Sequence, residues 1–213
     1  MELIVISKPS FFKGEAQLIN ALFDLGMQRF QLRKTSGDKQ AYEQLLGEIH
    51  PDYLDRIALH QFHELAPDFG IHRLHFKEQE RLEGQHVNFI TQPSFSLSTS
   101  IHSIDHLTDL LVFKHTFFGP IFQSISKKDY PGIVPADFKL PLAGTPNRPQ
   151  TAPGKRDQTA PKVMALGGVT ASKISLLQQM NFDGAAVLGA LWNTPELAIP
   201  NFKKLKQACQ TYP

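Results

Sequence analysis

Two glycine-containing segments near the C-terminus have the composition of an anion-binding site. Val163–Val169 contains Gly167 and Gly168, and Gly184–Leu191 contains Gly189. Glycine tolerates left-handed turns and lets the backbone approach a ligand closely. The start of a helix after such a turn presents free N–H groups to an anion. The sequence therefore predicts a phosphate site made largely of backbone at these glycines.

Polar side chains at two other predicted strand ends have the chemistry to bind the same kind of ligand. Gln31 and Arg33 are two residues apart, so on a strand they point to the same side, and a guanidinium suits phosphate or pyrophosphate. Ser124, Ser126 and the following Lys127 offer hydroxyls and an ammonium. The alternatives are that Arg33 closes the barrel end through ion pairs and that the serines lie in an ordinary solvated loop.

Histidine is abundant, with nine in the chain. His72 and His75 are three residues apart, so on a strand they face opposite sides and make a poor metal pair. No cysteine or carboxylate spacing of the zinc type accompanies them. His60 lies at the end of a predicted strand and His102 lies two residues after Ser100, so both are predicted at the mouth.

The elements that must position these residues alternate between short apolar strands and amphipathic helices. Helices are predicted over Gly14–Leu25, Lys39–Ile49, the stretch after Thr170, and Asn201–Gln210. Eight such repeats favour a single α/β domain over residues 1–213, a (β/α)8 TIM barrel. An open doubly wound sheet would instead want glycines after its first strand. The eight predicted strands are Leu3–Ser7, Arg29–Arg33, Ile57–Gln61, Arg73–Phe76, Phe95–Ile101, Leu110–Phe118, Val163–Leu166 and Ala185–Leu188.

One stretch interrupts this alternation. Pro141–Lys162 is rich in Pro, Thr, Gly and basic residues and nearly lacks large apolar ones, which predicts a flexible insertion without secondary structure. Asp137–Leu140 is interpreted as the remnant of the helix that would normally follow the sixth strand. A lid over the mouth is the alternative to a neutral insertion.

Composition narrows the class of protein. A net charge of +2 gives no reason to expect nucleic acid or a membrane surface as partner. The single cysteine, Cys209, excludes an internal disulfide framework and fits a reducing compartment. No apolar run approaches the roughly 18 residues of a membrane span. A cytoplasmic location is expected, and a homo-oligomer is left open.

The strand-end residues together resemble those of the thiamine phosphate synthase/TenI family of barrels, from Met1 to about Trp192. The synthase joins hydroxymethylpyrimidine pyrophosphate to thiazole phosphate and releases pyrophosphate. The pieces that carry the resemblance are Gln31–Lys34, Leu74–Phe76, Ser100–His102, Gly119–Lys128, and Ala165–Gly168 with Gly184–Gly189.

The resemblance implies a role for each matched position. Gln31, Arg33, Lys34 and Lys127 would face the pyrophosphate, and Ser100 would contact the pyrimidine. The thiazole side would be lined by Ser124 and Ser126, and its phosphate held by Gly168, Leu188 and Gly189.

The same resemblance implies Mg²⁺ as cofactor, yet the usual aspartates are missing. Their positions read His60-Gln61 and Lys77–Glu80, which leaves Glu80 as the predicted metal ligand. Gly189 stands where a serine is common, and the family's lysine position falls at Thr35. The pyrimidine-pyrophosphate half thus departs from the family pattern more than the thiazole-phosphate half.

Two further functions therefore remain beside the synthase. TenI members shift a proton in a carboxylated thiazole phosphate, and here His60 or His102 would be the base, because Pro120 occupies the position of a histidine used by some members. A non-catalytic binder of thiazole phosphate is the other alternative, since the fold does not fix the activity.

Overall fold

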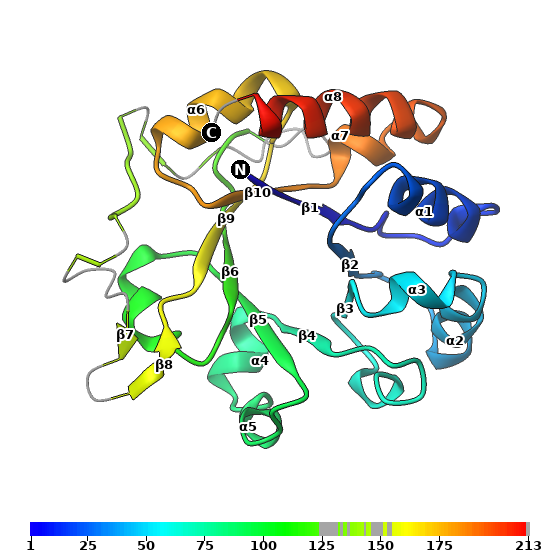
Figure 1. The fold of residues 1–213 in the computed structure, drawn as a ribbon, viewed down its shortest axis with the longest axis horizontal. Coiled ribbons are helices and arrows are strands. Elements are labelled where there is room, and N and C mark those ends of the chain that lie inside the picture. Colours follow the sequence, from blue (N-terminus) through cyan, green and yellow to red (C-terminus); the bar gives the residue numbers. More distant parts are fainter. Residues whose placement is uncertain are drawn as a thin grey trace.

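Eight parallel strands close into a barrel in the computed structural model of this chain, which is viewed along the barrel in Figure 1. The structure describes residues 1–123, 132, 134–135, 137–142, 144–145, 151–152 and 155–211, with the backbone alone for 151–152 and 155–159. The predicted (β/α)8 fold is confirmed. Around the barrel the strand order is β1-β10-β9-β6-β5-β4-β3-β2.

All eight predicted strands are present, most within two residues of their predicted bounds. The exception is β6, which begins at His115 because the residues before it form a 3-10 helix, η2 (Ile104–Asp109), and a turn at 111–112. The strands are β1 (Glu2–Ile6), β2 (Phe30–Leu32), β3 (Ile57–Leu59), β4 (Arg73–Phe76), β5 (Ser96–Ile101), β6 (His115–Phe118), β9 (Lys162–Leu166) and β10 (Gly184–Val187).

Helices cover the outside of the barrel unevenly. Three 3-10 helices besides η2 replace or precede regular helices: η1 (His63–Leu65), η3 (Ala171–Lys173) and η4 (Pro195–Leu197). None of the described helices is long and apolar enough to cross a membrane. The α-helices are α1 (Glu15–Asp24), α2 (Lys39–Gly47), α3 (Pro51–Leu54), α4 (Glu78–Leu82), α5 (Val87–Ile90), α6 (Ile174–Gln179), α7 (Gly189–Trp192) and α8 (Ala198–Gln210).

The alternation of side chains along the strands builds two cores. One set packs between strands and helices in a large apolar cluster that includes Phe30, Leu59 and Phe202. The other set points into the barrel. Its apolar part comes from β1, β6, β9 and β10, as Ile4, Ile6, Phe117, Met164 and Ala186.

The other half of the barrel interior, on β2 to β5 and the start of β6, is polar. Strand register places His75 beside Ser98, and Ser98 beside His115. Gln31, His60, His75 and Ser98 are all buried. The barrel is thus divided lengthwise into an apolar wall and a polar wall.

The segment after β6 differs from its prediction in two places. Asp137–Leu140 forms no helix, and Leu140 is instead anchored to the end of α6, donating its N–H to the Met180 carbonyl at 2.9 Å. Within Pro141–Lys162, β7 (Thr151–Ala152) pairs antiparallel with β8 (Lys155–Thr159) where no strand was predicted. Hydrogen bonds between neighbouring chain segments do not require the apolar residues that this stretch lacks.

Gly119, just after β6, offers a test of the packing at the mouth. A Cβ added there would lie 2.0 Å from the Leu166 carbonyl oxygen, whereas one added at Gly47 on α2 would meet nothing within 4 Å. Gly119→Ala is expected to lower the free energy of unfolding by about 2 kcal/mol or more, the cost of overpacking. Gly47→Ala should leave it unchanged or raise it by roughly 0.5 kcal/mol. Urea denaturation measures both, and equal stabilities would contradict the packing.

Candidate active site at the barrel mouth

The loop after β9 adopts a conformation that only glycine accommodates. Gly167 and Gly168 have φ values of 99° and 63°, and a Cβ on Gly168 would lie 2.2 Å from the Gln123 carbonyl oxygen. Lys173 stabilises the turn, because its Nζ donates a hydrogen bond to the Gly168 carbonyl at 3.1 Å. The loop therefore packs directly on the segment that follows β6 and is held in one shape.

Two neighbouring loops present unpaired amides at this end of the barrel. Among the described residues, the backbone N–H groups of Gly168, Val169, Gly189 and Ala190 donate to no acceptor. They follow β9 and β10, which pair in parallel, so both loops leave the same edge of the barrel. Unpaired N–H groups that converge beside glycine are suited to an anion.

Thr170 and Leu188 lie next to the glycines of these two loops. Thr170 directly precedes the helix predicted after β9; its hydroxyl is 3.0 Å from the Ser172 hydroxyl and makes no cap hydrogen bond. Leu188 is half-buried and packs with its side chain against the apolar wall.

A cavity of about 290 Å³ lies beside both loops. It has room for a phosphate group and brings one cation, Lys204 of α8, to the same place. Its lining residues are Thr170, Ala171, Gly189, Ala190, Asn193, Thr194, Asn201, Lys204 and Leu205.

The polar wall carries a hydrogen-bond chain that ends at the mouth. His75 Nδ1 is 3.0 Å from Ser98 Oγ, and its Nε2 is 3.0 Å from Ser100 Oγ. Ser98 Oγ also donates to the Leu74 carbonyl at 3.3 Å. Ser100, predicted from the resemblance to contact a substrate ring, is thus backed by a buried imidazole.

A second chain runs beside the first. His60 Nε2 is 2.8 Å from Gln31 Oε1, and Gln31 Nε2 is 3.4 Å from His115 Nε2. The rings of His60 and His75 stack with centroids 4.0 Å apart. Gln31 therefore faces the interior as its spacing from Arg33 predicted, but it lies beneath the mouth and holds two histidines.

Burial keeps these three imidazoles neutral. Desolvation lowers the pKa of His60 and of His75 well below 6.5, with the Arg33 charge adding to the effect on His60. Desolvation also lowers the pKa of His115 to about 4. A neutral imidazole has one N–H donor and one acceptor nitrogen, and His60 Nδ1 is buried without a partner among the described residues.

Arg33 is the predicted site residue most available to a ligand. Its side chain is exposed, and within the described residues its guanidinium makes no hydrogen bond or ion pair. Its backbone is fixed by Ser7, whose Oγ accepts from Arg33 N at 2.9 Å and donates to Arg33 O at 2.6 Å. His102 is also exposed, and its ring nitrogen Nδ1 contacts a carboxylate oxygen of Glu78 on α4.

Lys34 lies away from the mouth, contrary to its predicted role toward pyrophosphate. Successive residues at a strand end point to opposite sides, so Lys34 turns outward where Arg33 turns inward. Its ammonium is buried in an ion pair with Glu15 and donates to the Lys8 carbonyl at 3.0 Å. Burial lowers the pKa of Lys34 and raises that of Glu15, while their attraction opposes both shifts.

The residues at the predicted magnesium position do not fit a metal ion. Both carboxylate oxygens of Glu80 are bound by Lys77, at 2.8 Å from its backbone N and 2.9 Å from Nζ. Gln61 accepts from Tyr42 at 2.6 Å and donates to the Lys34 carbonyl at 2.7 Å. In the described part of the chain, no three His, Cys, Asp or Glu residues come together as a metal site.

Three predicted site residues lie outside the described part of the chain, and two polar residues of the inner wall were not predicted from the sequence. Ser124, Ser126 and Lys127 lie outside the described residues. Ser98 and His115 were not predicted, although the alternation Ser96, Ser98, Ser100 along one strand was a signal for a polar face turned inward.

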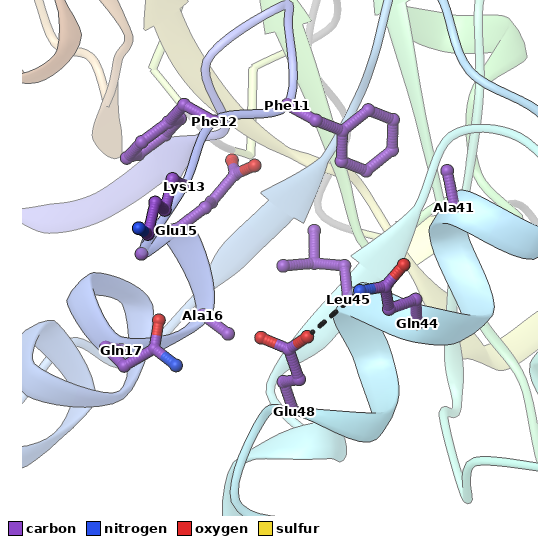
Figure 2. Close-up of a pocket in the computed structure, with 11 residues that line it drawn as sticks. Phe11, Phe12, Lys13, Glu15, Ala16, Gln17, Ala41, Gln44, Leu45 and Glu48 are labelled. Carbon is purple, nitrogen blue, oxygen red and sulfur yellow. Dashed lines mark hydrogen bonds between the residues drawn. The ribbon is translucent and has the colours of Figure 1, made fainter.

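A larger cavity, of about 630 Å³, lies outside the barrel between α1 and α2 (Figure 2). Phe11, Phe12 and Leu45 line it, with Gln44 and Glu48 hydrogen-bonded at its edge. None of the predicted site residues lines this cavity, so it is not the site that the sequence predicted.

Comparison with known proteins gives similarity at the level of solved structures. Thiamine phosphate pyrophosphorylase from Bacteroides thetaiotaomicron is 25% identical, with a TM-score of 0.73 and full coverage of both chains. The enzyme of that name from Pyrococcus furiosus is 14% identical, with a TM-score of 0.72 over 98% of this chain and 95% of that one. A 3-hexulose-6-phosphate synthase from Salmonella typhimurium is 10% identical, with a TM-score of 0.58 and full coverage of both. No protein-family model and no curated protein matches the sequence.

The buried histidines predict a loss of stability in acid. An unfolded histidine has a pKa of about 6.5, so below that pH the unfolded chain binds protons that the folded chain excludes. The stabilisation is fully present above pH 6.5 and is lost as pH falls toward the folded pKa, about 4 for His115. Each histidine contributes a slope of up to about 1.4 kcal/mol per pH unit in this window.

Urea denaturation between pH 7 and 4.5 measures that slope. His115→Gln retains an acceptor for Gln31 and should make the slope shallower, whereas His72→Gln, on an exposed residue, should not change it. An unchanged slope in His115→Gln would show that this imidazole does not stay neutral.

The Lys34–Glu15 pair predicts strong coupling in a double-mutant cycle. Removing one partner leaves a buried charge, so Lys34→Met or Glu15→Leu alone should cost about 3–5 kcal/mol. The double variant should recover most of this loss, because no charge is left unpaired. Additive losses in urea denaturation would show that the two residues do not depend on each other.

Proposed function

We propose that this chain is an enzyme of the thiamine phosphate synthase type, which joins hydroxymethylpyrimidine pyrophosphate to thiazole phosphate and releases pyrophosphate. The observation that carries the proposal is the set of unpaired amides on the paired loops at Gly168 and Gly189. The full-length similarity to a thiamine phosphate pyrophosphorylase at 25% identity supports it. The proposed partners are two small phosphorylated molecules.

The reaction requires an oriented nucleophile and a stabilised leaving group. The thiazole nitrogen forms a bond to the methylene carbon of the pyrimidine, and the carbon–oxygen bond breaks with its electron pair passing to pyrophosphate. Holding the thiazole phosphate at Gly168 and Gly189 orients the ring, which lowers the entropic part of the barrier. Arg33, unpaired and exposed, is the described cation best placed to stabilise pyrophosphate.

Lys127 is the second cation proposed for the pyrophosphate, on the resemblance alone. Lys77 is less suited, because its Nζ is paired with Glu80 at 2.9 Å. Since the described residues do not fit magnesium, no step of this proposal passes through a metal.

A second candidate, isomerisation of a carboxylated thiazole phosphate, is favoured by a specific observation. Lys34, expected at the pyrophosphate, and Glu80, expected at the metal ion, are both engaged in internal bonds, as is Gln61 at the other metal position. A proton shift needs only the phosphate loops and a base, and His60 offers a neutral imidazole with an unpaired Nδ1. A non-catalytic binder would hold thiazole phosphate at the two loops and catalyse neither the synthase nor the isomerase reaction.

The synthase proposal predicts a separation between catalysis and binding at the mouth. Purified protein mixed with both substrates and magnesium should form thiamine phosphate. Arg33→Ala should reduce turnover by at least 100-fold, roughly the loss of one strong electrostatic contact, and leave thiazole phosphate affinity unchanged. Gly168→Ala should weaken thiazole phosphate binding, because the new Cβ clashes with the Gln123 carbonyl. Turnover is followed by product formation and affinity by calorimetry.

The matched control is Arg29→Ala at the opposite end of the barrel, where Arg29 precedes β2. It should change neither turnover nor affinity. Solvent deuterium entering a carboxylated thiazole phosphate, without thiamine phosphate formation, would replace the synthase by the isomerase. Equal loss of turnover and thiazole phosphate affinity in Arg33→Ala would contradict the assignment of Arg33 to pyrophosphate and of the glycine loops to thiazole phosphate.

A further inference from the structure

The cavity between α1 and α2 has the size of a small-molecule site and no part in the proposed reaction. Its volume of about 630 Å³ falls within the roughly 300–1,000 Å³ of ligand pockets in proteins. Its walls come from the segment before α1, from the first turn of α1 and from one face of α2 (Figure 2). None of the residues assigned to the barrel mouth lines it, so a ligand bound here would be separate from the proposed substrates.

Two phenylalanine rings form an apolar wall of this cavity, and both are held in place without a ligand. Phe11 packs edge-on against Tyr42, with ring centroids 5.8 Å apart, and Lys34 Nζ lies 4.6 Å from the Phe11 centroid. Phe12 packs against Trp192, with centroids 6.1 Å apart. Both phenylalanines are half-buried and line the cavity. Aromatic rings that are fixed in advance favour the binding of another flat ring.

The Glu15 carboxylate is the buried polar group of the cavity. Its side chain is 2% exposed, lines the cavity and points toward the end where the two rings lie (Figure 2). One oxygen pairs with Lys34, while the other, Oε2, makes no hydrogen bond among the described residues. Burial raises the pKa of Glu15, and the Lys34 ammonium and the Phe12 N–H oppose that rise. Because an unpaired buried acceptor is costly, a ligand that donates to Oε2 would be favoured.

The charged residues that line the cavity leave no net charge to attract an ion. Glu15 is paired with Lys34, and the other two charged lining residues, Lys13 and Glu48, are exposed and opposite in sign. Glu48 also accepts a hydrogen bond from Gln44 Nε2 at 3.3 Å. A charged ligand placed against the two rings would lose its hydration without gaining a free counter-charge, which favours an uncharged one.

We propose that this cavity is a second ligand site, which takes an uncharged aromatic molecule carrying one N–H or O–H donor. The ring of the ligand would lie against Phe11, Phe12 and Leu45, and its donor would be directed at Glu15 Oε2. This site goes beyond the proposed function, because it does not depend on which reaction the mouth catalyses.

Indole and benzofuran test the ligand class, because they share a shape and only indole has an N–H donor. Titrated into the whole chain with ¹³C-labelled methyl groups, indole should shift the signals of Ala16 and Leu45 and leave that of Ala186, inside the barrel, unchanged. Indole should bind at least about tenfold more tightly than benzofuran, the effect of about one hydrogen bond. Tryptamine, which adds an ammonium group, should bind more weakly than indole.

Two variants locate the ligand and its acceptor. Ala41→Trp fills the cavity and should abolish the indole-induced shifts. Gln40→Trp is the matched control, because it adds the same ring to an exposed position of α2 that does not line the cavity, and it should leave the shifts unchanged. The double variant Glu15→Leu/Lys34→Met, in which no charge is left unpaired, should bind indole and benzofuran equally. Far-UV circular dichroism checks that each variant is folded.

The outcomes separate this proposal from the proposed function. Absence of indole binding at millimolar concentration, equal affinity of the wild type for indole and benzofuran, or tighter binding of tryptamine would overturn the second site as proposed. Indole-induced shifts that persist in folded Ala41→Trp, or a preference for indole that persists in the double variant, would do the same. Absence of thiamine phosphate formation with the expected indole binding would remove the synthase and leave this site.

Discussion

Most polar side chains on the inner wall of this barrel are hydrogen-bonded to one another, and the arrangement of the site depends on this constraint. On β2 to β6, Gln31, His60, His75 and Ser98 are buried, and Ser100 and His115 are half-buried. Desolvation lowers the pKa of each of these histidines, which favours neutral rings that hydrogen-bond to Gln31, Ser98 and Ser100.

Charge is consequently kept at the rim or placed outside the barrel. Arg33 remains exposed at the mouth, while Lys34 turns outward into a buried pair with Glu15. Glu80 is neutralised by Lys77 beside it. Among the described residues, the mouth thus has fewer free charges than the sequence predicted.

The apolar wall of the barrel, on β1, β6, β9 and β10, differs from the polar wall in how it could bind a ligand. It is apolar inside and ends in the two loops at Gly168 and Gly189, whose unpaired amides lie near a cavity that Lys204 also lines. Backbone dipoles fixed by the packing of Gly168 against the chain after β6 do not need to reorganise when a ligand binds.

The sequence by itself determined the eight strands, their order and the glycine loops, because hydrophobic period and glycine placement are local properties. Residue parity also placed Gln31 and Arg33 on the inner face. The partners of each polar group were decided only by the tertiary structure: Glu15 for Lys34, His115 for Gln31, and Ser98 for His75 are 19 to 84 residues apart in sequence. Barrel closure brings them together, so a polar residue available in sequence, such as Lys34, became internal. Hydrogen-bond and charge satisfaction is a property of the closed barrel and not of any one strand.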